Sequence, residues 1–172
     1  MIHPKTDPVG IDKVIDRIQN IVHDPLETAW GNVDVYGRVY RIQKQERVEL
    51  QRYAGNGNYK PVLFSEGNKV FFVQGTSPDV VSGTATNDLW MVVIAKLDSD
   101  EFRKDEEAHE LIMTSLSTNF LSKVIGFEYG MENLKRVVED SIQGNFKYSD
   151  IHPYHVFMVK MNIEYSLIKN NC

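Results

Sequence analysis

The sequence predicts a single α+β domain, in which helices pack on one face of a mainly antiparallel sheet that carries an extended β-hairpin insertion. Three observations lead to this prediction. The chain opens with an apolar stripe at helical spacing, has a nearly unbroken apolar run around residue 92, and closes with a strictly alternating run. A length of 172 residues suits one domain and is short for two, so we expect residues 1–172 to form a single domain.

The N-terminal part of the chain predicts one helix followed by one strand. The helix covers residues 10–24, begins after Asp7-Pro8 and ends at Pro25. Residues 32–43 are rich in Val and Tyr, which favours a strand, and Gly37 weakens its pairing or marks a bulge. The apolar stripe of the helix consists of Ile11, Val14, Ile15, Ile18, Ile21 and Val22.

Residues 43–85 are predicted to form a hairpin-rich insertion. The letters GNGN at 55–58 indicate a turn. A second turn at Glu66-Gly67-Asn68 separates two apolar runs, 60–64 and 69–73, which predicts that these runs pair as a β-hairpin. The polar segment 76–88 is predicted to be a loop.

The C-terminal half predicts a strand, two helices and a final strand. Residues 89–97 are apolar and β-branched, as in a strand buried on both faces in the middle of a sheet. Residues 102–120 and 130–142 have helical spacing, and 154–167 alternate as a long strand with one buried face. Its expected inward residues are Phe157, Val159, Met161, Ile163 and Tyr165, and its outward residues are Met158, Lys160, Asn162 and Glu164.

Composition excludes several classes of protein. A net charge of −5, with Lys and Arg scattered along the chain, argues against a general duplex-binding surface. The single cysteine, Cys172, excludes an internal disulfide and a cysteine zinc site, and it fits a reducing compartment. No run is apolar enough to span a bilayer, and the first ten residues lack a secretory signal, so we expect a protein made in the cytoplasm.

The familiar catalytic and metal motifs fail on their spacing. In the acidic stretch 98–110, the positions that an EF-hand loop needs as Gly and Glu are Arg103 and His109. His109-Glu110 begins like a zinc-protease helix, but Met113 stands where the second histidine would be. The sequence also has no phosphate-binding P-loop and no G-x-S-x-G nucleophile turn. We therefore predict a protein that is not an enzyme, with no catalytic, cofactor-binding or metal residues.

One histidine pair leaves an alternative open. His152 and His155 fall on opposite faces of an extended strand, although Pro153 could bend the chain and bring them together. A metal site needs three or four ligands, and Asp150 is the nearest further candidate. An enzyme would require these residues to converge with others from separate segments, for example His109.

The order of elements in the second half resembles that of tail-terminator and neck-ring proteins of tailed bacteriophages. The resemblance rests on the buried strand LWMVVIAKL, the helix EEAHELIMTSL, a short irregular segment and the closing HPYHVFMVKMNIEYSL. It covers about the last 90 residues well and the first helix loosely. The hairpin-rich insertion is longer than a minimal terminator needs, which leaves open a terminator or another neck ring, such as those beneath the portal of short-tailed and crAss-like phages.

This resemblance implies a structural subunit of the virion neck or tail, assembled in the host cytoplasm. Its expected partners are copies of itself in a ring and adjacent portal, neck or tail proteins, with DNA at most passing through the ring lumen and no membrane. The alternative is a monomeric binding or adaptor module of an unrelated α+β fold.

The predicted hairpin suggests where subunits would meet. Both of its faces carry apolar residues, although a two-stranded ribbon can lay only one face on its own domain. An exposed apolar ribbon promotes aggregation, so a cover is expected, either a helix of the same chain or a neighbouring subunit. The interface hypothesis comprises Val62, Leu63, Phe64, Val70, Phe71, Phe72 and Val73.

Overall fold

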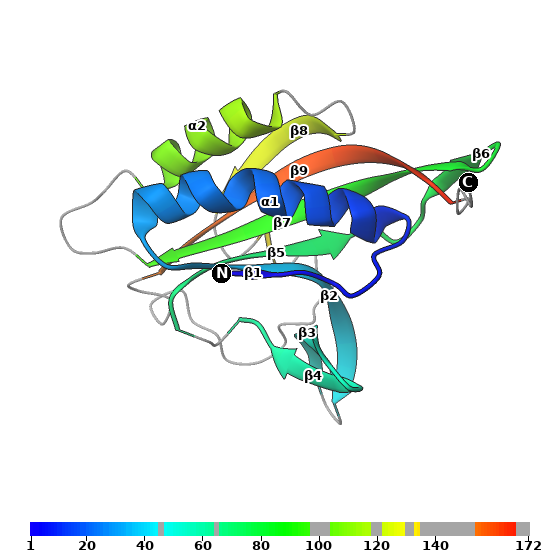
Figure 1. Cartoon of the computed structure of the whole chain (residues 1–172), viewed down its shortest axis with the longest axis horizontal. Coiled ribbons are helices and arrows are strands. Elements are labelled where there is room, and N and C mark those ends of the chain that lie inside the picture. The colour runs from blue at the N-terminus through cyan, green and yellow to red at the C-terminus, as the bar shows by residue number, and fades with distance from the viewer. Residues whose placement is uncertain are drawn as a thin grey trace.

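The computed structural model describes residues 1–44, 47–63, 66–96, 104–117, 122–129, 133–134 and 154–167. These residues form an α+β fold with a mixed, mostly antiparallel sheet, as predicted (Figure 1). In chain order the elements are β1 (Ile2–His3), α1 (Ile11–Trp30), β2 (Val33–Lys44), β3 (Arg47–Gly55), β4 (Asn58–Pro61), β5 (Asn68–Gln74), β6 (Asp79–Val81), β7 (Thr84–Lys96), α2 (Lys104–Leu116), β8 (Ser122–Tyr129) and β9 (Tyr154–Ser166).

The sheet has the strand order β4-β3-β2-β5-β7-β9-β8, with β1 added to β2 and β6 added to β7. The pairs β1–β2 and β2–β5 are parallel, and the other pairs are antiparallel. The first half of β2 lies in the main sheet, and its second half curves away with β3 and β4 as a ribbon that projects from the side opposite the helices (Figure 1).

Both helices lie on the same face of the sheet, as predicted, and α1 packs against α2 (Figure 1). Helix α1 places its apolar stripe toward the core, from Ile11 to Leu26, and α2 contributes Ala108, Ile112 and Leu116. Burial of each such large apolar side chain contributes about 1.5–3 kcal/mol. The predicted end of α1 at Pro25 is wrong, because the helix continues to Trp30 with Pro25 inside it.

The opposite face of the sheet has an apolar cluster of its own. It includes Phe71 on β5, Val92 on β7 and Met158 on β9, all fully buried, together with the buried Leu134. The inward register predicted for the last strand is correct. The prediction that this strand has only one buried face is wrong, because Val156 and Met158 are buried on the other side.

The centre of the sheet also corrects the predicted hairpin. Strand β5 pairs in parallel with β2 and antiparallel with β7, whereas β4 pairs with β3 and with no other strand of the described structure. Residues 60–63 are therefore not partners of residues 69–73, and Phe64 lies outside the described residues. Every strand offers the same backbone donors and acceptors to a neighbour. A turn between two apolar runs therefore does not determine that these two runs pair with each other. The prediction of a buried strand in the middle of the sheet is confirmed by β7, between β5 and β9, although β7 begins at Thr84 and Leu97 lies outside the described residues.

Strands β1, β6 and β8 were not predicted, whereas one turn and one strand irregularity were. Strand β6 forms a short hairpin with β7 through Ser82-Gly83, inside the segment predicted to be a loop. Strand β8 pairs with β9 where no element was assigned. The turn at 55–58 is confirmed, with positive φ at Asn56 and Gly57, as a two-residue turn requires. The ladder between β2 and β5 shifts register between Val35 and Arg38, which confirms the irregularity at Gly37.

Candidate functional site

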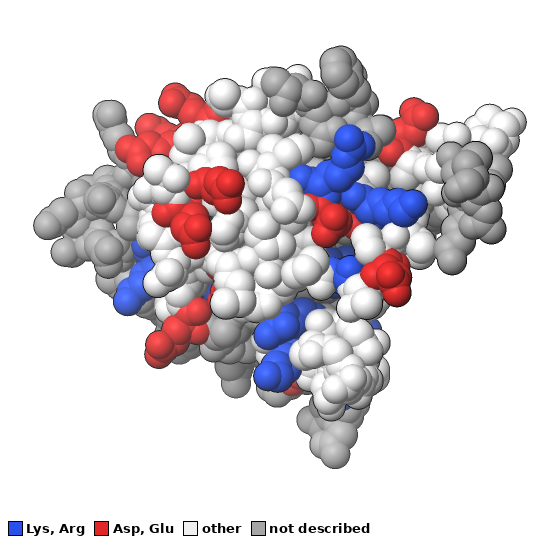
Figure 2. Space-filling model, in the orientation of Figure 1, with Lys and Arg blue, Asp and Glu red and all other residues white. Residues whose placement is uncertain are grey.

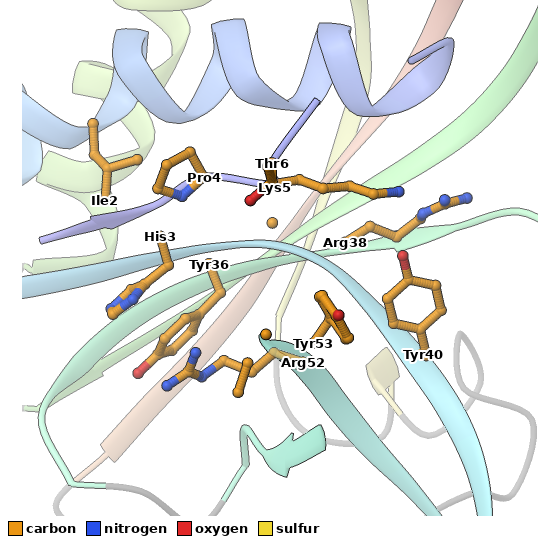
Figure 3. Close-up of a pocket in the computed structure, with 13 residues that line it drawn as sticks. Ile2, His3, Pro4, Lys5, Thr6, Tyr36, Arg38, Tyr40, Arg52 and Tyr53 are labelled. Atoms are coloured by element: carbon orange, nitrogen blue, oxygen red, sulfur yellow. The ribbon is translucent and has the colours of Figure 1, made fainter. Parts of the chain in front are cut away.

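The candidate site is a notch in the edge of β2. On this edge β1 pairs with Val35 and Tyr36, and β3 pairs from Val39 onward. The intervening Gly37 and Arg38 have no partner on that edge from either strand, so the two short neighbours leave a gap between them. A cavity of ≈ 280 Å³ occupies this gap (Figure 3). Its walls come from residues 2–6, from 36–40 on β2 and from 52–55 on β3.

A buried glutamine holds the rim of the notch in place. Gln19 on α1 is 1% exposed, and its side-chain nitrogen donates hydrogen bonds to the carbonyl oxygens of Val35 (2.9 Å) and His3 (3.2 Å). A Cβ at Gly37 would meet the Gln19 side chain and the His3 carbonyl at 4.0 Å. The register shift at Gly37 and the hydrogen bonds of Gln19 keep β1 and β3 apart. The gap between these two strands is therefore a feature of the fold.

Two cations of the notch converge on one buried carboxylate. Asp12, 4% exposed on α1, accepts hydrogen bonds from Lys5 and, at 3.0 Å, from Arg38. Arg38 also donates to Gln74 on β5. The hydrogen bond to Asp12 raises the pKa of Lys5 above its usual value, so Lys5 stays charged. These contacts hold two positive side chains at one end of the cavity.

The other end is a stack of three side chains. The rings of His3 and Tyr36 stack with their centroids 4.6 Å apart, and the Arg52 guanidinium lies 4.6 Å from the Tyr36 centroid (Figure 3). Asp34 holds the stack, because its carboxylate accepts a hydrogen bond from Tyr36 (3.1 Å) and lies 2.9 Å from His3 Nε2. Although burial raises the pKa of Asp34, the bonds to His3 and Tyr36 outweigh it and lower the pKa below its usual value.

The mouth of the notch carries exposed tyrosines. Tyr53 is 46% exposed and Tyr59 is 44% exposed, and their rings meet edge to face with centroids 5.4 Å apart. Tyr59 makes a similar contact with Tyr40, at 5.9 Å. Tyr40 and Tyr53 line the cavity, whereas Tyr59 on β4 contacts both of these rings but does not line the cavity.

The charge of the notch differs from that of the whole chain. Lys5, Arg38 and Arg52 line it, and none of the thirteen lining residues in the described structure is Asp or Glu. The chain as a whole has a net charge of −5. Figure 2 shows Lys and Arg side chains at the base of the projecting ribbon, on a surface where acidic side chains gather elsewhere. The notch is therefore a local cationic and aromatic site on an acidic protein.

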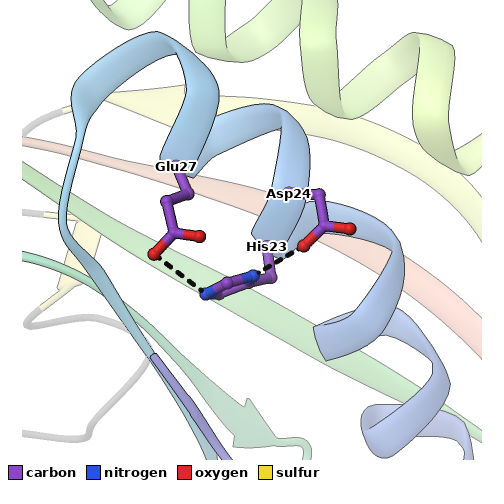
Figure 4. Close-up of side chains that lie close together, drawn as sticks. All are labelled: His23, Asp24 and Glu27. Carbon is purple, nitrogen blue, oxygen red and sulfur yellow. Dashed lines mark hydrogen bonds and ion pairs between the residues drawn. The ribbon is translucent and has the colours of Figure 1, made fainter.

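A histidine with two carboxylates occupies one turn of α1 (Figure 4). His23 Nδ1 lies 2.8 Å from Asp24, and its Nε2 lies 3.6 Å from Glu27. The Asp24 side chain is 87% exposed, and all three ligand atoms come from one side of a single helix. His23 Nδ1 is paired with Asp24, whereas His23 Nε2 is buried and has no hydrogen-bond partner among the described residues. Because three ligands on one side of a single helix do not surround an ion, the arrangement gives no argument for a metal centre.

The interface residues predicted from the sequence are mostly inside the chain. Val70, Phe71, Phe72 and Val73 on β5 are at most 3% exposed, and Val62 is 1% exposed. They therefore offer no surface to a neighbouring subunit. The predicted hairpin, whose exposed apolar faces were expected to require a cover, is not formed by the described residues. Leu63 packs at the edge of the second apolar cluster. Phe64 lies outside the described residues.

The histidines considered for metal do not form a ligand set in the described structure. Asp150 and His152 lie outside the described residues, as does nearly all of the predicted helix 130–142. His109 and His155 flank Tyr129 at the end of β8. The Tyr129 hydroxyl lies 3.2 Å from His109 Nδ1, and its ring centroid lies 6.5 Å from that of His155.

Within the described structure, none of the site residues predicted from the sequence lies in the notch. Its clearest trace in the sequence is the run YGRVY at 36–40, where aromatic and basic residues surround a glycine in a strand. Lys5, Asp12 and Arg52 come from separate segments, so no local motif could join them.

Comparison with models of known protein families gave no match, and no curated protein matched the sequence significantly. Within the described residues, neither helix combines the length and apolar character needed to cross a membrane.

Proposed function

We propose that the chain is a non-catalytic, ring-forming structural subunit of a bacteriophage head-to-tail connector, neck or tail terminator. Two arguments support this proposal: the order of elements in the second half of the chain and one exposed apolar surface. The observation that carries most weight is this surface, the apolar tip, defined as Val80, Val81 and Leu167.

The apolar tip lies where β6, β7 and β9 end together. Val80 is 55% exposed, Val81 is 72% exposed and Leu167 is 52% exposed. The Leu167 amide donates to the carbonyl of Gly83 (2.9 Å), which places Leu167 beside the β6–β7 turn. The tip extends from the main body beyond the helices (Figure 1). Strongly exposed apolar side chains at the end of a projecting hairpin are candidates for a protein–protein contact.

The geometry favours contact between different surfaces of identical subunits. The apolar tip and the projecting β3–β4 ribbon lie on different sides of the molecule (Figure 1), and each presents exposed apolar or aromatic side chains. When one surface of a subunit binds a different surface of the next, the contact repeats around an axis and closes a ring if the rotation fits. In this arrangement the tip of each subunit packs on its neighbour.

Light scattering after size-exclusion chromatography tests the proposal over a range of concentrations. We expect an oligomer of defined mass for the parent protein and a monomer when Val80→Ser and Val81→Ser are combined. Both side chains are exposed, so circular dichroism and thermal melting should remain close to those of the parent.

Met113→Ser serves as the matched control, because Met113 is also an exposed apolar residue (41%) but lies on α2. This variant should still assemble. A parent protein that stays monomeric at every concentration contradicts the proposal, as does an oligomer that the tip variant leaves intact.

The second candidate function is a monomeric binding or adaptor module, and the notch is the observation that favours it. A cavity with fixed charged and aromatic walls is typical of a ligand site. A stable monomer that binds a small ligand in the notch would favour this module over the ring subunit.

A further inference from the structure

The Arg52 guanidinium is the cation of the notch that has no acidic partner. Lys5 and Arg38 share Asp12, whereas the one contact that Arg52 makes through its charged group in the described structure is with the Tyr36 ring. Arg52 is half-buried and lines the cavity. A guanidinium presents five N–H donors in a planar fork that matches an oxyanion. Its donors are therefore positioned to bind an anion in the cavity.

The strand register supplies a second, independent observation. Arg52 on β3 lies directly opposite Lys60 on β4. Residues directly opposite in an antiparallel pair share a face of the sheet, and like charges in such a pair are destabilising. An anion beside Arg52 would remove this repulsion. The unfavourable pair stands next to the cavity, where binding could compensate for it.

The walls of the notch also suit a planar ring. Tyr53 and Tyr40 line the cavity from β3 and β2, next to the His3–Tyr36–Arg52 stack. Aromatic side chains beside cationic ones are the combination with which proteins bind bases and phosphates of single nucleic-acid strands and nucleotides. The Arg38 guanidinium already lies 5.3 Å from the Tyr40 ring centroid, so Tyr53 is the ring offered to a ligand. A simple carboxylate would use the cations and leave Tyr53 without a stacked ligand.

We propose that the notch binds a nucleotide: its phosphate lies at Arg52, at the end opposite Lys5 and Arg38, and its base lies against Tyr53, the exposed tyrosine that lines the cavity. The volume of ≈ 280 Å³ lies just below the range of about 300–1,000 Å³ typical of small-molecule sites, which favours a small ligand such as a single nucleotide. The ligand is either a free mononucleotide or one unit of a single strand, because both present the same phosphate and base. This inference does not depend on ring formation.

Isothermal titration calorimetry of the full chain with adenosine 5′-monophosphate tests the proposal. We expect binding to one site per chain, weaker binding of inorganic phosphate, and still weaker binding of adenosine or glutamate. Arg52→Gln should weaken binding at least about tenfold, the loss typical of one hydrogen bond to a charged group. Arg52→Lys, which keeps the charge but loses the fork, should fall between the parent and Arg52→Gln.

Lys44→Gln is the matched control, since it removes one positive charge from an exposed position on β2 outside the notch. It should bind like the parent. Thermal melting of each variant separates a loss of binding from a loss of fold. Tyr53→Leu is a second test variant that keeps every charge. It should weaken the binding of adenosine 5′-monophosphate more than the binding of inorganic phosphate.

Three results would overturn the inference. The first is no binding at about 10 mM ligand, a concentration well above the Kd of weak complexes. The second is equal affinity of the parent and Arg52→Gln for the nucleotide. The third is glutamate binding as tightly as the nucleotide. A short oligothymidylate identifies the source of the ligand. If it binds more tightly than the mononucleotide, the natural ligand is a single strand. If it does not, the ligand is a free nucleotide.

Discussion

The centre of the sheet, at β7 and β9, and the notch beside β2 are stabilised by different interactions. Strands β7 and β9 pair along their whole length, from Thr84 opposite Ser166 to Lys96 opposite Tyr154, and both faces of the pair are covered by apolar side chains. In the notch, β1 and β3 leave a gap that hydrogen bonds and ion pairs define. The centre therefore supplies stability, whereas the notch supplies a fixed chemical surface at little gain in stability.

The difference predicts that the largest loss of stability comes from the centre. Phe157 on β9 is fully buried in the helix-side core, so Phe157→Ala should cost about 3–5 kcal/mol of unfolding free energy through lost burial and a cavity. Urea denaturation measures this cost. Lys160→Ala on the same strand is the control.

Lys160 has its side chain partly exposed and pairs with Asp88 at 3.2 Å, so its replacement should cost less than about 1 kcal/mol. Equal losses for Phe157→Ala and Lys160→Ala would contradict the contrast between the two faces of β9.

Lys69 is the exception within the centre, and it makes stability depend on pH. Lys69 on β5 is 1% exposed, and burial lowers its pKa to about 8, although attraction to Asp34 partly opposes this shift. In the unfolded chain the same group has its ordinary pKa of 10.5. The unfolded state therefore binds more protons between these values, so stability should rise as the pH rises from about 8 to about 10.5.

Lys69→Met tests this prediction by removing the buried charge while retaining most of the volume. At pH 7 the variant should be more stable than the parent by up to about 3 kcal/mol, from 1.36 kcal/mol per unit of pKa. The advantage should shrink above pH 8 and vanish near the ordinary lysine pKa. An advantage that is the same at pH 7 and pH 10 would show that Lys69 is charged in the folded protein throughout this range.

Apart from the control variants, the smallest expected effect is that of the polar contacts of the notch. Asp12→Asn removes the charge that Lys5 and Arg38 share, but both cations are partly exposed and can be rehydrated. We expect a loss of about 1–2 kcal/mol by urea denaturation in low salt, and a smaller loss in high salt.

Asp79→Asn, at an exposed position on β6, should change stability very little. A loss for Asp12→Asn as large as that for Phe157→Ala would mean that the notch is an integral part of the core.

Local pattern determined much of the fold. The apolar stripe of α1, the unbroken apolar run of β7 and the alternation of β9 each follow from which side chains are buried, and burial has a period of 3.6 in a helix and 2 in a strand. The glycine at position 37 and the turn at 55–58 also followed from local backbone preference. These features depend on residues within a few positions of one another.

Tertiary structure alone decided the pairing of strands and the notch. The run at 70–73 has the apolar character of a strand, but every strand offers the same backbone donors and acceptors, so the sequence did not show that β5 lies between β2 and β7. Asp12, Arg38 and Arg52 come from α1, β2 and β3, and their charges became one site because the fold brought those elements together. Side-chain periodicity records burial along one element, whereas a site depends on distances between elements that no local pattern contains.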